Sequence, residues 1–394
     1  MTHNLFVEPW FYAAVAAVIT AFRLLRSRVK PQWLLLPVNA GFLGVFAGAR
    51  VWLPLLALYA VVVPALAVWM RAGGAQKAAR LLVAIALSLA VLVVFRYPSF
   101  VAFSKTLTAL SSWEWLGLSY LTFRAIDLLM AASRAKTAPD PWVAAAYLTF
   151  FAPYVSGPIN RFAAFTRDVT GASKPLGFDR IRRNLIRASA GVLKLLLLSR
   201  LAFYASIVAP GYTTPHTLGE LTLGLYAYLF YIYFDFSGYC DVAIAVADFF
   251  DVGLPENFRW PMFAPNLQDF WNRWHISLSH FCRDYVFFPL LKKISPGGAL
   301  YASAFAILAT FSVIGLWHGD SLHWVSYGLL HGAGLAWVMF YRQGGEWALG
   351  ERFEWLQDAW LYRAGATVLT FNFVAVSLLL TIDFPRAAAL LALR

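Results

Sequence analysis

Long apolar runs recur along the chain, and they limit its fold more than any other feature. They lie at about 10–25, 33–49, 52–70, 81–95, 113–132, 188–208, 219–249, 300–317, 322–341 and 364–382. A helix rises about 1.5 Å per residue, so about 20 apolar residues cross a hydrocarbon core about 30 Å thick. Hydrophobic residues make up 60% of the 394 positions and charged residues only 13%, which is too apolar for a soluble domain. The sequence predicts an all-α, polytopic integral membrane protein with roughly ten or eleven transmembrane helices.

The net charge of +12 fits membrane topology better than binding to nucleic acid. The basic residues lie in short links beside apolar runs, where the positive-inside rule places them. The links at 23–30 and 71–80 are therefore expected to lie in the cytoplasm, and the N-terminus is expected to lie outside. Membrane lipid is the expected partner, and nucleic acid is not. Because the first basic cluster follows the first apolar run, that run is interpreted as a retained helix and not as a cleaved signal. Residues 1–394 are interpreted as one membrane-embedded domain.

The region between the fifth and sixth long runs departs from this pattern. A short apolar run at 142–155 is interrupted by Pro153, and seven basic residues follow between Arg161 and Arg187. A full crossing would leave all of these bases outside, so a re-entrant or interfacial segment is predicted. It would be followed by a basic amphipathic helix at about 178–187 on the cytoplasmic surface. An ordinary solvated helix face explains these bases equally well.

One carboxylate and two cysteines inside the apolar runs are explained without a special function. Asp235 is a functional candidate because an unpaired carboxylate is costly in a membrane, but we favour hydrogen bonds to Ser237 and Tyr239 at a helix junction. Cys240 and Cys282 have neither a motif spacing nor an evident partner, so both are predicted to be packed thiols.

The stretch from Asp269 to His331 carries five of the seven histidines. If residues 271–285 form a helix, residues spaced by three and four share a face. The polar face would carry Asn272, His275, Ser279 and Arg283. The opposite, apolar face would carry Trp274, Leu278 and Phe281.

Several short motifs resemble, in order and spacing, those of the membrane-bound O-acyltransferase family. They are Ser156-Gly157-Pro158-Ile159-Asn160-Arg161-Phe162, Phe234-Asp235-Phe236-Ser237-Gly238-Tyr239, Pro255-Glu256-Asn257-Phe258, Asp269-Phe270-Trp271-Asn272-Arg273-Trp274-His275-Ile276-Ser277-Leu278-Ser279, Arg283-Asp284-Tyr285, Leu316-Trp317-His318-Gly319 and Leu330-His331-Gly332. The resemblance covers over half of the chain, from about Gly117 to Gly334. It implies the multi-span helical fold of that family, with the motif-bearing core at about 117–334, and transfer of an acyl group to a hydroxyl.

Two branches of the family that modify the bacterial cell envelope match the pattern. The branch similar to the alginate O-acetylase usually continues after Arg-Asp-Tyr with Ile-Pro-Leu-Gly-Gly-Asn, whereas this chain reads Phe287-Phe288-Pro289-Leu290-Leu291. The departure favours the branch that transfers D-alanyl groups in teichoic-acid D-alanylation. O-acetylation of an exopolysaccharide is the alternative, because His275-Ile276-Ser277-Leu278-Ser279 fits that branch equally well. A transporter and a non-catalytic scaffold are alternatives from other classes, and the absence of evident internal repeats in the sequence argues against the transporter.

The resemblance implies that His318 is the general base and that His275 is the second polar catalytic residue. Acyl transfer to a hydroxyl needs a base that removes the hydroxyl proton, and histidine, with an unperturbed pKa of about 6.5, suits that role at neutral pH. Burial favours the neutral form that a base requires. Trp317 and Gly319, on either side of His318, predict a tight apolar wall that the backbone approaches closely.

The other histidines of the stretch are interpreted as hydrogen-bonded core residues: His280, His323 and His331. His275 and His280 are five residues apart, as are His318 and His323, so neither pair stacks on one helical face. No cysteine or carboxylate cluster accompanies them in the sequence, so no metal site is expected.

A larger set of residues is expected to line the substrate tunnel: Asp269, Trp271, Asn272, Arg273, Ser279, Arg283, Asp284 and Trp317. Arg273 and Arg283 would also suit the phosphate of an anionic donor. The resemblance implies no bound cofactor, and a donor thioester carried by CoA or by the phosphopantetheine of an acyl carrier protein. The implied acceptor is a hydroxyl of an extracytoplasmic cell-envelope polymer, reached through an extracytoplasmic partner acyltransferase. The implied location is the cytoplasmic (inner) membrane.

Overall fold

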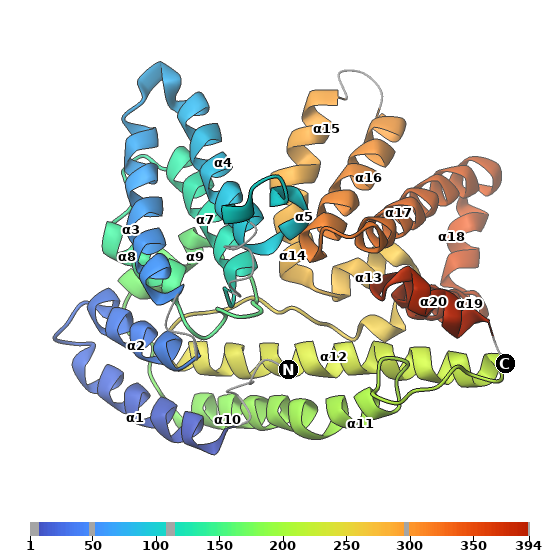
Figure 1. Ribbon diagram of the computed structural model, residues 1–394, viewed down its shortest axis with the longest axis horizontal. Helices are drawn as coiled ribbons and strands as arrows, with labels where there is room; N and C mark the ends of the chain where they lie inside the picture. The colour runs from blue at the N-terminus through green and yellow to red at the C-terminus, as the bar shows by residue number, and fades with distance from the viewer. Residues whose placement is uncertain (1–7, 47–51, 108–114, 295–298, 393–394) are drawn as a thin grey trace. The chain divides into compact units, whose positions relative to one another are not determined.

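The computed structural model describes residues 8–46, 52–107, 115–294 and 299–392 (Figure 1). Within these ranges the chain is helical and forms no β-strand, with one isolated antiparallel bridge between Phe258 and Trp274. The predicted all-α class is therefore confirmed. The chain divides into two compact units, which are described separately below. Unit 1 comprises Met1–Leu196 and Gly238–Pro255, and unit 2 comprises Leu197–Ser237 and Glu256–Arg394.

Unit 1 contains a cluster of aromatic rings from segments far apart in the sequence. Its helices are α1 (Pro9–Leu25), α2 (Pro31–Phe46), α3 (Trp52–Arg71), η2 (Gly74–Gln76), α4 (Lys77–Arg96), α5 (Pro98–Val101), α7 (Leu118–Arg134), α8 (Pro141–Thr149), α9 (Phe162–Thr170) and α10 (Phe178–Leu193). Phe42 of α2 stacks on Phe151 at 4.3 Å between ring centroids, and Phe151 meets Phe250 edge-on. Asp140 caps α8 by accepting a hydrogen bond from the backbone N–H of Trp142 at 2.8 Å.

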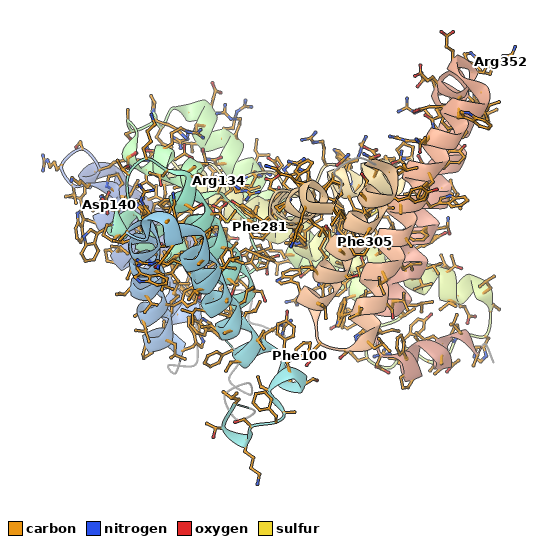
Figure 2. The ribbon with its side chains drawn as sticks, turned by 90° about the horizontal axis from the view of Figure 1, so that it is seen from above. Phe100, Arg134, Asp140, Phe281, Phe305 and Arg352 are labelled. Carbon is orange, nitrogen blue, oxygen red and sulfur yellow. The ribbon has the colours of Figure 1, made fainter. Side chains whose placement is uncertain are left out.

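Unit 2 contains the second group of long helices together with several short ones. They are α11 (Ser199–Tyr204), η4 (Pro261–Phe263), α13 (Leu267–Arg273), α14 (Ile276–Cys282), η5 (Arg283–Phe287), α15 (Phe288–Ile294), α16 (Ala299–His318), α17 (Leu322–Leu349), α18 (Glu351–Asp358), α19 (Trp360–Ser377), η6 (Leu378–Thr381) and α20 (Phe384–Leu391). The long helix α12 (Leu218–Phe249) contributes to both units. Phe281 of α14 is buried, whereas Phe305 of α16 is exposed, as suits a side chain that faces lipid (Figure 2).

Five of the described helical segments are long and apolar enough to cross a membrane. They are Trp52–Arg71, Gly74–Arg96, Leu218–Phe249, Leu300–His318 and Trp360–Thr381. The chain is therefore a multi-pass membrane protein, while the count of ten or eleven crossings stays a prediction. Helix α8 has 9 residues, too few to span a bilayer, which agrees with a re-entrant or interfacial segment. The ends of the expected spans at 33–49 and 113–132 lie partly outside the described residues.

The basic segment at 178–187 is not a separate surface helix. Helix α10 continues through a π-helical segment (Lys194–Leu198) into α11, so the helix is unbroken from Phe178 to Tyr204. Three of its bases face α12, which runs alongside it (Figure 1). The ion pairs are Arg180 with Asp248 at 2.7 Å, Arg187 with Asp241 at 3.0 Å and Lys194 with Asp241 at 2.6 Å. The solvated-face interpretation is therefore wrong for Arg180 and Arg187, which pair with carboxylates of α12, whereas Arg182 and Arg183 are exposed. A position of this helix on the membrane surface stays a prediction.

Candidate active site

His318 is the last residue of α16, and small residues hold it close to α17. The two helices are neighbours in Figure 1, and a short link joins them. A β-carbon on Gly328 would collide with the carbonyl oxygen of Phe311, and one on Gly315 would collide with that of Trp324. Glycine at these positions thus allows the backbones of the two helices to approach each other closely.

Aromatic side chains surround the half-buried imidazole of His318. Trp324 stacks on it with 5.0 Å between ring centroids, Trp317 lies at 4.6 Å, and Tyr327 lies edge-on at 6.4 Å. A β-carbon on Gly319 would lie 2.5 Å from Cδ1 of Trp324. The expected apolar wall with close backbone approach is confirmed, and Trp324 is a member of it that the sequence did not reveal.

His275 lies at a break between α13 and α14, so the predicted continuous helix over 271–285 is wrong. His275 has φ 46° and ψ 48°, the left-handed conformation, which costs a residue with a β-carbon about 1–2 kcal/mol. Helix α13 ends at Arg273, whose carbonyl accepts a hydrogen bond from the N–H of Arg259 at 2.9 Å. The two predicted faces of that helix therefore do not form, although the three residues expected on its apolar face, Trp274, Leu278 and Phe281, are all buried.

The left-handed turn places the His275 ring in a buried aromatic environment near His318. His275 is 4% exposed, with Phe236 at 4.7 Å and Trp317 at 6.1 Å between ring centroids. Burial, and secondarily the charge of nearby His318, lower the pKa of His275 to about 3. The two histidines that the resemblance implied are therefore brought together in unit 2, with Trp317 in contact with both. His275 is held neutral at physiological pH.

This lowered pKa predicts a pH-dependent stability. Between about pH 3 and the unperturbed value of about 6.5, unfolded His275 is protonated and folded His275 is not. The unfolded state then binds more protons, so the free energy of unfolding falls as the pH decreases from about 6.5 towards 3. Thermal unfolding of the detergent-solubilised protein across this range measures the effect. His275→Asn, which does not titrate and tolerates the left-handed conformation, should show a shallower dependence; equal slopes would contradict the expectation.

Four of the other expected tunnel residues form ion pairs with close neighbours in the sequence. Asp269 accepts a hydrogen bond from Arg273 within α13 at 2.8 Å, and Arg283 pairs with its neighbour Asp284 at 3.3 Å. Asn272 is exposed. Trp317 contacts His275, and Trp271 contacts His331. Ser279 lies on α14, four residues after His275. The hydroxyl oxygen of Ser279 is buried and has no hydrogen-bond partner among the described residues.

Of the three histidines expected in the core, His331 fits that interpretation fully. It is 0% exposed, its Nδ1 accepts a hydrogen bond from the indole N–H of Trp271 at 3.3 Å, and its Nε2 lies 2.9 Å from Oγ of Ser377. Because an indole N–H can only donate, the ring proton lies on Nε2 and is donated to Ser377. His323 is half-buried against Trp324, and His280 is exposed, so the core interpretation is wrong for His280.

Asp235 does not hold the helix junction that was expected. It is exposed on α12, and the hydroxyl of Tyr239 instead donates to the carbonyl of Ala152 at 3.2 Å and accepts from the N–H of Val155 at 3.2 Å. Cys240 and Cys282 are both buried, which agrees with the prediction of packed thiols. No group of three or more histidine, cysteine, aspartate or glutamate residues that could hold a metal ion occurs in the described part of the chain.

The sequence of the chain is similar to those of known membrane proteins. Residues 81–344, more than half of the chain, match the model of the membrane-bound O-acyltransferase family. The teichoic acid D-alanyltransferase of Bacillus subtilis (strain 168) is 33% identical over 269 residues, which cover 66% of this chain and 67% of that protein. A peptidoglycan O-acetyltransferase of Helicobacter pylori is 31% identical, over 47% of this chain and 35% of its own length. A probable alginate O-acetylase of Pseudomonas syringae pv. tomato is 28% identical, over 73% of this chain and 55% of its own length.

Proposed function

The chain belongs to the membrane-bound O-acyltransferase family, and from this premise we propose that His318 is its general base and that His275 is the second catalytic residue. The observation that carries the proposal is the proximity of the two buried or half-buried imidazoles, with Trp317 in contact with both. Burial lowers the pKa of His275 and keeps that imidazole neutral, and the proposed base, His318, lies near it.

The proposed reaction moves an acyl group from a thioester to a hydroxyl. The neutral imidazole of His318 accepts the hydroxyl proton as the hydroxyl oxygen attacks the thioester carbonyl. The new carbon–oxygen bond forms, the carbon–sulfur bond breaks, and the proton passes to the departing thiolate. His275 supports this step as a buried neutral partner beside His318. No bound cofactor enters the reaction, because the thioester, on a phosphopantetheine carrier protein or on CoA, is a substrate.

We infer that the acyl group is D-alanyl and that the eventual acceptor is a hydroxyl of an extracytoplasmic cell-envelope polymer. The teichoic acid D-alanyltransferase of Bacillus subtilis supports this choice, because its similarity extends over 66% of this chain and 67% of that protein. The absence of Gly-Gly-Asn after Arg283-Asp284-Tyr285 supports the same branch. The donor would be a cytoplasmic acyl carrier protein, and the enzyme would lie in the inner membrane. An extracytoplasmic partner acyltransferase would complete transfer of the acyl group to the polymer.

O-acetylation of an envelope polysaccharide is the second candidate. It is favoured by similarity to a probable alginate O-acetylase over 73% of this chain, although that match covers only 55% of the relative. In this case an acetyl group would take the place of D-alanyl, with the same two histidines.

Donor competition in proteoliposomes tests the choice. We expect purified protein to transfer radiolabel from D-alanyl carrier protein to an acceptor fraction, and not from acetyl carrier protein or acetyl-CoA. Transfer from an acetyl donor alone would establish the second candidate. Transfer from none of them, with envelope acceptor and partner protein supplied, would contradict the enzymatic assignment and favour a scaffold.

A further inference from the structure

The left-handed turn at His275 is held by a residue from outside the local sequence. An N-cap residue normally accepts hydrogen bonds from the first N–H groups of its own helix. His275 is the N-cap of α14, but its side chain makes no such bond. Instead, the carbonyl of Asn257 accepts the N–H of Ile276 at 3.0 Å. The side-chain oxygen of Asn257 accepts the N–H of Ser277 at 3.0 Å and the hydroxyl of Ser277 at 2.8 Å.

These bonds lie where water cannot replace them. Asn257 is 1% exposed, and His275 and Ser277 are each 4% exposed. Loss of the Asn257 oxygen would leave two buried donors of Ser277 without this acceptor, which is costly in an apolar surrounding. The backbone segment that begins at Asn257 also runs antiparallel to the end of α13, through the bridge between Phe258 and Trp274. The backbone next to Asn257 is therefore held in place as well as its side chain.

We propose that Asn257 is a positioning residue that holds His275 in its left-handed conformation and so directs the imidazole towards Trp317 and His318. A strained backbone at a functional residue persists only where its surroundings over-determine it. Here the carbonyl and side-chain oxygens of Asn257 together fix the residues immediately after His275. Without the side-chain oxygen, the turn relaxes and the imidazole leaves its place beside Trp317. The inference rests on the proposed function, since Asn257 acts through His275.

Two substitutions separate the acceptor from the shape of the side chain. Asn257→Leu removes the acceptor at similar volume, and Asn257→Asp keeps an oxygen at the same place. We expect Asn257→Leu to lower kcat for acyl transfer about 10- to 100-fold, the range that a displacement of about 1 Å causes, with KM little changed. Asn257→Asp should retain most of the activity. Asn266→Leu is the matched control: it removes an ordinary cap, on α13, where Asn266 accepts the N–H of Asp269 at 2.9 Å.

A double-mutant cycle shows whether Asn257 acts through His275. In a His275→Ala background, Asn257→Leu should cause no further loss, because there is no imidazole left to position. A cryo-electron microscopy structure of Asn257→Leu should show residue 275 out of the left-handed region. An unchanged turn, wild-type kcat, or an equal loss in the His275→Ala background would each overturn the assignment. His318→Ala in the same assay distinguishes failure of this inference from failure of the proposed function. If His318→Ala is inactive while Asn257→Leu is fully active, only the role of Asn257 is contradicted. If His318→Ala is active as well, the proposed function is also contradicted.

Discussion

Replacing His318 by alanine is expected to lower the rate of acyl transfer by about 10²- to 10⁴-fold, the usual contribution of a positioned general base. The reason is local. His318 ends α16 in an aromatic enclosure made by Trp317, Trp324 and Tyr327, and alanine at this position leaves nothing to accept the hydroxyl proton. The measurement is transfer from the preferred donor in proteoliposomes, with equal amounts of folded protein verified by gel filtration.

Two further variants make the result specific to the base. His318→Gln keeps a planar polar group of similar reach but cannot serve as a base at neutral pH, so it should be as inactive as the alanine variant. His280→Ala is the matched control, because His280 is an exposed histidine on α14. It should transfer at close to the wild-type rate. Wild-type transfer by His318→Gln would show that His318 only packs, and the catalytic assignment would be abandoned.

The sequence predicted the long helices well because their signal is local. Most apolar runs expected to span the membrane lie within a described helix, but the run at 188–208 begins inside a helix that starts at Phe178 and extends past its end at Tyr204. The strongest departure, at 178–187, has a tertiary cause. From the sequence alone, Arg180 and Arg187 are expected to face solvent or phospholipid head groups. In the structure they form ion pairs with carboxylates of α12, and no local pattern in α10 reveals those partners.

The sequence named the two candidate histidines but not the geometry around them. The motifs around His275 and His318 identified the two histidines, and the structure places both in unit 2 near Trp317. The break at His275 could not be read from helical periodicity, because the acceptor that stabilises it, Asn257, is supplied by an earlier segment. The one available signal was a polar residue in the Pro255-Glu256-Asn257-Phe258 motif, between apolar stretches, which proved to be buried.

Removing the carboxylate of Asp251 in unit 1 is expected to cause the largest loss of stability of any single charge change proposed. Asp251 is 0% exposed and pairs with Arg23 at 2.9 Å, Arg26 at 3.0 Å and Arg180 at 3.0 Å. The site thus joins the end of α1, the start of α10 and the end of α12 around one buried anion. Without it, Arg23 and Arg26 lose this ion-pair partner, and Arg180 retains its pair with the half-buried Asp248. Breaking a buried pair typically costs about 3–5 kcal/mol, and the cost should reach at least that range here.

Asp251→Asn is the decisive variant, because Asp251 has φ 64° and asparagine tolerates the left-handed conformation while removing the charge. We expect a clear fall in the thermal unfolding temperature of the solubilised protein, and partial recovery when Arg26→Met is added, since one stranded cation is then removed. Asp179→Ala is the matched control: its pair with Arg182, at 3.8 Å on the exposed face of α10, should contribute almost nothing. If Asp251→Asn unfolds at the wild-type temperature, the three arginines are stabilised by other groups, and the buried anion is not what holds α1, α10 and α12 together.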